Sequence, residues 1–104
     1  MLAETHTRDS VSRYSAERNL HHADFFCHAP EAKKVSIVGD FNNWNPNATP
    51  MVRQPDGNWM VSLELRHGYH RYVFLVDGEP MLDPRATGIA RDHHNNRVSL
   101  IAVS

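Results

Sequence analysis

Two adjacent stretches of alternating apolar and polar residues constrain the fold of this chain most strongly. Residues 59–65 carry a large apolar side chain at every second position, and residues 69–76 repeat the pattern after a turn at His67-Gly68. Alternation of this kind predicts β-strands with one face turned toward a core. Tight-turn signals flank the pair, with Pro-Asp-Gly-Asn at residues 55–58 and Asp-Gly at residues 77–78. We therefore expect antiparallel β structure.

Further short strands are predicted along the chain from residue 23 onward. They are expected over residues 24–28, 34–39, 51–54 and 97–103, with almost no helix between them. Many short strands at close spacing are typical of two packed sheets. The predicted fold class is all-β, an antiparallel β-sandwich of about seven strands.

The chain of 104 residues has room for one domain. Residues 1–20 are polar and are predicted to be an N-terminal tail or a short helix that begins at Asp9 or Ser10. Few apolar residues would line one face of such a helix, so the sequence does not decide between a helix and a disordered segment. Residues 21–104 form the predicted sandwich domain.

Composition excludes several classes of partner. The net charge of −1 gives no general attraction to nucleic acid or to an anionic membrane, and no segment has the apolar length of a membrane span. The polar N-terminus lacks a secretory apolar core, and the single cysteine, Cys27, forms no internal disulfide. We expect a cytoplasmic protein, although a secreted protein without its signal would have the same composition.

No catalytic, metal or cofactor site is expected. The 8 histidines include pairs at residues 21–22 and 93–94, but no His-x-x-x-His spacing or cysteine partner accompanies them. The aspartates at positions 40, 56, 77 and 83 all occur in turn contexts, where Asp is favoured for backbone reasons. The sequence therefore predicts neither an enzyme nor a cofactor.

A polar, asparagine-rich turn after the strand at residues 34–39 presents Trp44. An exposed indole offers a flat apolar surface on which a sugar can stack. The alternative is a ring that folds back and caps the open edge of the sandwich. Trp59, in contrast, shares the parity of Val61 and Leu63, so it is expected in the core.

Six motifs occur in the order and at the spacing found in carbohydrate-binding module family 48. They are Phe26-x-x-Ala29-Pro30, Gly39-Asp40-Phe41-Asn42-Asn43-Trp44, Asp56-Gly57-Asn58-Trp59, the run from Gly68 to Gly78, Asp83-Pro84 and Asn96-Arg97-Val98. The chain thus resembles, over about residues 23–103, the glycogen-binding domain of the AMP-activated kinase beta subunit and the N-terminal domains of isoamylases and branching enzymes. The resemblance implies an immunoglobulin-like sandwich that binds α-glucan and has no catalytic activity of its own.

The resemblance also implies a set of sugar-binding residues. Trp44 matches a tryptophan that stacks on glucose, and Asn96 matches an asparagine whose amide bonds glucose hydroxyls, although Asn96 also fits an ordinary turn. Two departures stand out, because Val73 replaces a sugar-binding lysine and Pro80 replaces a second stacking tryptophan.

Two further residues are candidates for the missing contacts. Arg71 lies two residues from Val73 on the same face of its strand, and His94 lies in the polar loop that precedes Asn96. The alternative for each is a solvated surface residue.

The expected ligand is an α-1,4/α-1,6-glucan such as glycogen or starch. A single stacking platform predicts weak binding near the millimolar range, about −4 kcal/mol. The alternative function is a protein-interaction or dimerisation domain of the same fold that serves a glucan-metabolising enzyme or a kinase complex. In that case Tyr69, Val73 and Leu75 form an outward apolar stripe that contacts a glycoside hydrolase, transferase or kinase partner, or a second copy.

Overall fold

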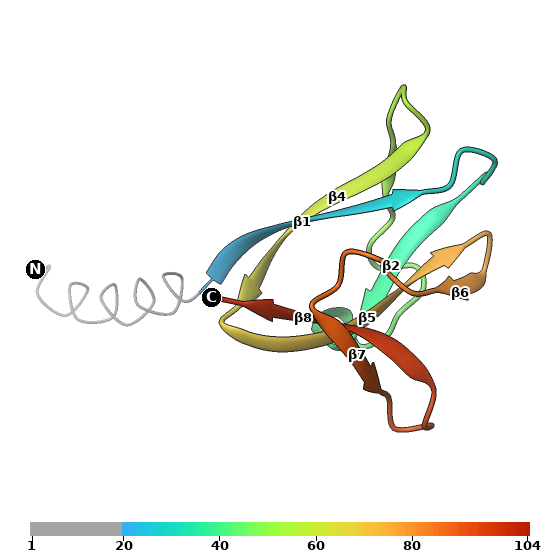
Figure 1. The fold of residues 1–104 in the computed structure, drawn as a ribbon. Helices are drawn as coiled ribbons and strands as arrows, with labels where there is room; N and C mark the ends of the chain where they lie inside the picture. Colours follow the sequence, from blue (N-terminus) through green and yellow to red (C-terminus); the bar gives the residue numbers. More distant parts are fainter. Residues whose placement is uncertain (1–19) are drawn as a thin grey trace, which may run out of the picture.

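The computed structural model of the chain describes residues 20–104, so the tail or helix predicted for residues 1–20 lies outside the described residues apart from Leu20. Eight strands and one 3-10 helix follow one another in this part of the chain (Figure 1). Their bounds are Leu20–His28 (β1), Val35–Gly39 (β2), Asp40–Asn42 (η1), Val52–Arg53 (β3), Asn58–Arg66 (β4), Gly68–Val76 (β5), Glu79–Met81 (β6), Gly88–Arg91 (β7) and Arg97–Val103 (β8).

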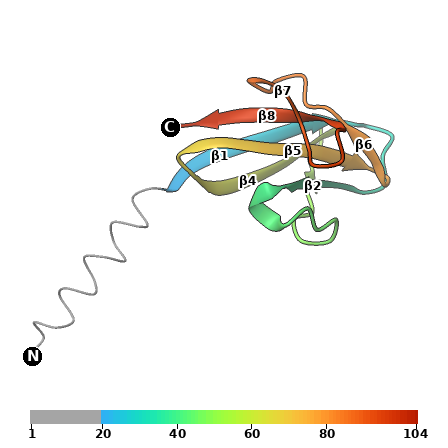
Figure 2. The same ribbon diagram turned by 90° about the horizontal axis from the view of Figure 1, so that it is seen from below.

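The strands form two antiparallel sheets. One sheet has the order β1-β4-β3, and the other has the order β2-β5-β8-β7 with β6 paired to β5. Figure 2 shows β2 and β7 at opposite edges of the second sheet, with β5 and β8 between them. This architecture confirms the predicted antiparallel β-sandwich.

Two strands were not predicted, and both are short. β6 contains Pro80, which lacks the N–H that a central strand needs and is tolerated at a sheet edge. β7 has four residues, begins at Gly88, and pairs only with β8 among the described strands. Neither segment shows enough alternation to indicate a strand from sequence alone.

The core lies between the inward faces of the two sheets. Phe25 and Tyr72 meet edge to face with ring centroids 5.0 Å apart. Trp59 is 7% exposed, as its parity predicts, and its indole N–H donates to the carbonyl oxygen of Ala29 at 2.9 Å. Cys27 is buried in the same cluster, and this burial raises the pKa of its thiol. The cysteine therefore behaves as a small apolar core residue.

A buried polar network joins the second sheet to the segment between β6 and β7. The Tyr72 hydroxyl donates to Asp83 Oδ2 at 2.6 Å, and the Asp83 backbone N–H donates to Ser99 Oγ at 2.7 Å. Burial, and then the bond to Asp83, raise the pKa of Tyr72. Because each of these polar groups has a partner, the network fixes the segment without an unsatisfied buried charge.

The part of the chain that the structure describes contains no helix long and apolar enough to cross a membrane.

The outer face of the first sheet carries a charge cluster around His22. The ring nitrogens lie 2.8 Å from Asp24 Oδ1 and 3.3 Å from Glu64 Oε2. The pKa of His22 is raised above its ordinary value of 6.5, mainly by the hydrogen bond to Glu64 and next by the charge of Asp24. Below that pKa, the protonated imidazole links β1 to β4 through Glu64.

This cluster predicts a pH dependence of stability. Because the folded state raises the pKa of His22, its contribution is fully present below about pH 6.5 and is lost as the pH rises through the folded pKa. Between about pH 6 and pH 8, the thermal unfolding midpoint should fall more steeply for the unaltered chain than for His22→Gln. The other histidines are common to both proteins. Parallel midpoint curves would show that the cluster adds no pH-dependent stability.

Candidate functional site

The last residue of β2, Gly39, has no room for a side chain. A Cβ atom at Gly39 would lie 2.6 Å from the carbonyl oxygen of Arg71 and 2.7 Å from the ring of Phe41. Contacts this short do not occur with real Cβ atoms. Glycine therefore allows β2 and η1 to lie directly against the backbone of β5.

Asp40 attaches the same turn to β5 through both carboxylate oxygens. Oδ2 accepts a hydrogen bond from the backbone N–H of Arg71 at 3.0 Å, and Oδ1 lies 3.1 Å from Nδ1 of His70. A charged acceptor strengthens such bonds relative to neutral pairs. The position of η1 on the second sheet is therefore fixed by side-chain contacts as well as by chain connectivity.

Asn42 closes the turn from the other side. Its Oδ1 accepts from the backbone N–H of Gly39, and its Nδ2 donates to the Ile37 carbonyl oxygen and to Thr49 Oγ1, each at 3.0 Å. One amide thus joins β2 to the segment that follows the turn, which holds the whole loop in one conformation.

Two consecutive residues then adopt left-handed backbone conformations. Asn43 has φ 58° and Trp44 has φ 56°. Asn visits this region readily, but for Trp it costs about 1–2 kcal/mol. The bond from the Trp44 N–H to the Gly39 carbonyl oxygen, 2.9 Å, helps to hold the chain there. The two residues reverse the chain and bring the indole back over the outer face of the second sheet.

The indole of Trp44 packs on a small apolar cluster of Val38, Val73 and Val98 on that outer face. Trp44 is consequently half-buried. The sequence left open whether the ring stacks on a ligand or folds back, and the structure shows that it folds back onto the sheet face rather than over an open edge. Its role in carbohydrate binding stays a prediction.

This packing corrects the predicted apolar stripe on β5. Val73 is only 8% exposed, and Leu75 is half-buried, because the turn after β2 folds over them. Only Tyr69 of the three remains open to solvent, at 71% exposed. An exposed stripe of Tyr69, Val73 and Leu75 for a protein partner or a second copy therefore does not exist in the described structure.

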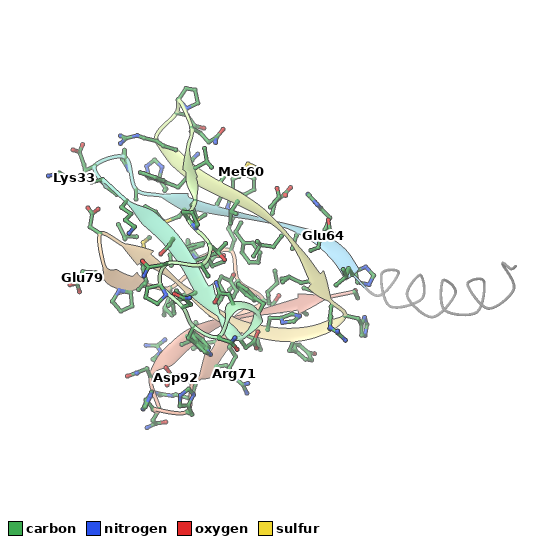
Figure 3. All side chains as sticks on the ribbon, turned by 180° about the vertical axis from the view of Figure 1, so that it is seen from behind. Lys33, Met60, Glu64, Arg71, Glu79 and Asp92 are labelled. Atoms are coloured by element: carbon green, nitrogen blue, oxygen red, sulfur yellow. The ribbon has the colours of Figure 1, made fainter. Side chains whose placement is uncertain are left out.

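A depression of about 300 Å³ lies beside the indole. Its walls come from the turn after β2, from β5 and from the hairpin between β7 and β8; the lining residues are Asp40, Trp44, Arg71, Arg91, Asp92 and His93. Figure 3 shows Arg71 and Asp92 on the same side of the molecule. The structure thus brings two predicted site residues, Trp44 and Arg71, to one surface.

The hairpin that forms the far wall is ordered around Asp92. Its Oδ1 accepts from the backbone N–H groups of His94 and Asn96, both at 2.9 Å. These bonds, led by the one from Asn96, hold the pKa of Asp92 below its ordinary range. Asn95, at φ 69°, completes the turn, and its carbonyl oxygen accepts from Arg91 at 3.0 Å.

The other two predicted residues lie in this hairpin but not among the lining residues. Asn96 and His94 are both exposed, and the Asn96 amide donates to Asp92 Oδ2 at 3.4 Å. The lining contains instead Asp40 and three hairpin residues that the sequence analysis missed. The three hairpin residues directly precede His94 in the sequence, and this proximity to a predicted site residue was the one signal that could have identified them. Asp40 had been interpreted only as a turn residue.

The charges in the depression leave donors for a ligand. Among residues 20–104, neither Arg71 nor Arg91 forms a salt bridge, whereas the two aspartates are engaged by backbone N–H groups. Guanidinium groups offer planar arrays of N–H donors that suit hydroxyl oxygens. No group of three or more His, Cys, Asp or Glu side chains in the described part is placed to hold a metal ion. The surface therefore combines an indole ring with hydrogen-bonding groups.

Comparison with known families identifies the class of this domain. Residues 24–104 match the family described as the glycogen recognition site of AMP-activated protein kinase. This match covers most of the chain, and the chain belongs to that family of carbohydrate-binding modules. The resemblance to carbohydrate-binding module family 48 is thereby confirmed.

Individual relatives are enzymes of glucan branching. The chain is 45% identical over 86 residues to a 1,4-alpha-glucan branching enzyme of Aquifex aeolicus (strain VF5), which covers 76% of this chain and 14% of the enzyme. It is 34% identical over 97 residues to the corresponding enzyme of Pseudomonas putida, with 88% and 13% covered. A branching enzyme of Arabidopsis thaliana is 54% identical over 35 residues, or 34% of this chain and 4% of the enzyme. The chain thus spans 14% or less of these relatives' length.

The arrangement of the turn predicts the effect of losing Asn42. Asn42→Ala removes three hydrogen bonds that close the loop, so the free energy of unfolding should fall by about 1–3 kcal/mol. Urea denaturation measures the change. Asn47→Ala, in the same loop but with an exposed side chain, should stay within about 0.5 kcal/mol of the unaltered chain. Equal losses in both variants would contradict a specific role for Asn42.

Proposed function

We propose that this domain binds α-glucan, glycogen or starch, at the depression beside Trp44 and performs no reaction on it. The observation that carries the proposal is the position of Trp44, an indole held by a tightly bonded turn at the wall of a depression with arginine and carboxylate groups. Membership in a glycogen-recognition family supports the same ligand class.

The lining residues suit the two kinds of surface that a glucose unit presents. The C–H face of the sugar ring is apolar and stacks on the indole of Trp44. The hydroxyls at its rim accept hydrogen bonds from Arg71 and Arg91 and donate to the oxygens of Asp40 and Asp92. A glucan is uncharged, so these contacts supply orientation rather than long-range attraction.

The same geometry limits the strength of binding. Because Trp44 packs on Val73 and Val98, only part of its ring is available to a sugar. Covering about 100 Å² of ring contributes roughly 2.5 kcal/mol, and association consumes much of the total gain. A single site should therefore bind in the millimolar range, about −4 kcal/mol.

The carboxylates of the depression support a binding role rather than hydrolysis. A glycosidase needs one carboxylic acid whose pKa is raised so that it can protonate the leaving group. Asp92 has the opposite shift, because backbone N–H groups stabilise its ionised form. Asp40 is tied to the Arg71 backbone as a structural acceptor. Asp92 therefore lacks the environment of a general acid, and Asp40 is engaged in holding the turn.

Weak binding suits a domain that keeps an associated enzyme or kinase complex on a polymer. Glycogen and starch present many identical chain ends and segments, so rebinding and multiple modules raise the effective affinity. The branching-enzyme relatives are several times longer than this chain and act on such polymers by name. We place the present domain in the same kind of assembly.

Replacement of Trp44 tests the proposal. Trp44→Leu keeps apolar cover over the valine cluster but removes the flat ring, so the retardation of the protein in native gels that contain glycogen should be lost with little loss of stability. Trp44→Ala should lose retardation and also about 2–3 kcal/mol of unfolding free energy.

The control is Val52→Ala, a change at an exposed apolar residue of the first sheet. This variant should migrate like the unaltered chain in every gel. Retardation of Trp44→Leu equal to that of the unaltered chain would exclude the indole as the platform.

A further inference from the structure

The most exposed large apolar side chain among the described residues is Tyr69, with 71% of its surface open to solvent. It lies at the second position of β5, far along the strand from the valine cluster that Trp44 covers. Tyr is enriched at binding interfaces, because its ring is apolar and its hydroxyl end stays hydrated.

A second depression, of about 440 Å³, borders this ring. Its wall combines apolar and polar side chains: Leu20, Asp40, Phe41, Glu64, Leu65, Arg66, Tyr69 and His70. Asp40 also lines the depression beside Trp44, so the two hollows meet at this carboxylate. The two depressions therefore share one wall residue.

The pleat of β5 sets the spacing along that surface. Tyr69, Arg71 and Val73 occupy alternate positions, so their side chains share the outer face, and Trp44 packs on the cluster that contains Val73. Val73 lies four positions along the strand from Tyr69, which is about 13 Å at roughly 3.3 Å per residue. A single sugar ring does not span this distance, whereas a chain of several glucose units does.

We propose that Tyr69 is a second stacking platform, and that a longer α-glucan lies along the outer face of β5 from Trp44, past Arg71, to Tyr69. This inference rests on the proposed function and extends its site. The far end of this glucan then lies at Tyr69, on the border of the second depression.

The lining of the second depression favours a sugar over an apolar protein surface. Glu64, Arg66 and Asp40 stand around the ring, and an apolar partner would bury these charged groups without hydrogen bonds. Glucose hydroxyls provide those bonds while the ring face covers Tyr69. His70 is already held, with its Nε2 2.9 Å from the Arg66 carbonyl oxygen, so the wall needs little rearrangement.

The test compares a short and a long malto-oligosaccharide. Titrations of maltotriose and maltoheptaose are followed by NMR at the Trp44 indole N–H, in the unaltered chain, Tyr69→Ala, Tyr69→Phe and the control Val52→Ala. Tyr69→Ala should bind maltoheptaose about fivefold to tenfold more weakly, the loss expected when about 50 Å² of ring surface is no longer covered. Its affinity for maltotriose at Trp44 should not change, and Tyr69→Phe and Val52→Ala should match the unaltered chain.

The outcomes distinguish a failure of the Tyr69 platform from a failure of the proposed glucan-binding function. Tyr69→Ala is expected to fold normally because the side chain is exposed, and its thermal unfolding midpoint checks this point. If the unaltered chain binds maltoheptaose and Tyr69→Ala binds it equally well, the second platform is wrong while the first stands. If the unaltered chain binds neither oligosaccharide, the proposed function itself is overturned.

Discussion

The attachment of the turn after β2 to the backbone of β5 determines the form of the whole outer surface. Asp40 holds the Arg71 N–H, and Gly39 lies where a Cβ would strike the Arg71 carbonyl oxygen. The turn is therefore held against the backbone of Arg71. Asn43 and Trp44 follow the turn in left-handed conformations, which set the direction of the chain. The indole of Trp44 then covers Val73, and the surface beside it is set before any ligand arrives.

This rigidity would affect the proposed sugar binding in two opposite ways. A preorganised ring loses little conformational entropy when a ligand covers it, which favours affinity. Packing on the valine cluster, however, hides part of the ring from the ligand. Position 73, where the resemblance implies a lysine, is buried in the cluster on which the indole packs, so a charged group there would be buried. The arrangement fixes the ring and leaves no solvated position for a charged side chain at residue 73.

Much of the sandwich could be predicted because its strands obey a simple alternation. Residues 97–103 were predicted with the bounds that β8 shows, and Trp59 was assigned to the core by parity alone. β6 and β7 could not be found this way, since three or four residues at a sheet edge carry too few side chains to show a period. The predicted exposure of Val73 on the outer face was wrong for another reason. The outward face of a strand faces solvent unless a distant segment folds over it, and parity contains no information on that segment.

The site was predictable in part. Trp44 and Arg71 came from a motif and from strand parity, and both line the depression. The choice between His93 and His94 depends on the hairpin turn, where Asp92 binds two backbone N–H groups and Asn95 adopts a left-handed conformation. Adjacent residues in such a turn point in different directions, so the sequence identifies the hairpin but not which of its side chains lines the depression.

The two tryptophans offer a direct test of the central claim, that Trp44 is a fixed glucan platform. Trp59 is buried and its indole N–H is bonded to Ala29, so it serves as an internal reference in the same protein. A ¹H–¹⁵N spectrum resolves both indole N–H groups during titration with maltoheptaose. The account predicts a saturable shift of the Trp44 signal and no shift of the Trp59 signal. Binding that shifts backbone signals elsewhere while the Trp44 indole stays unchanged would contradict it.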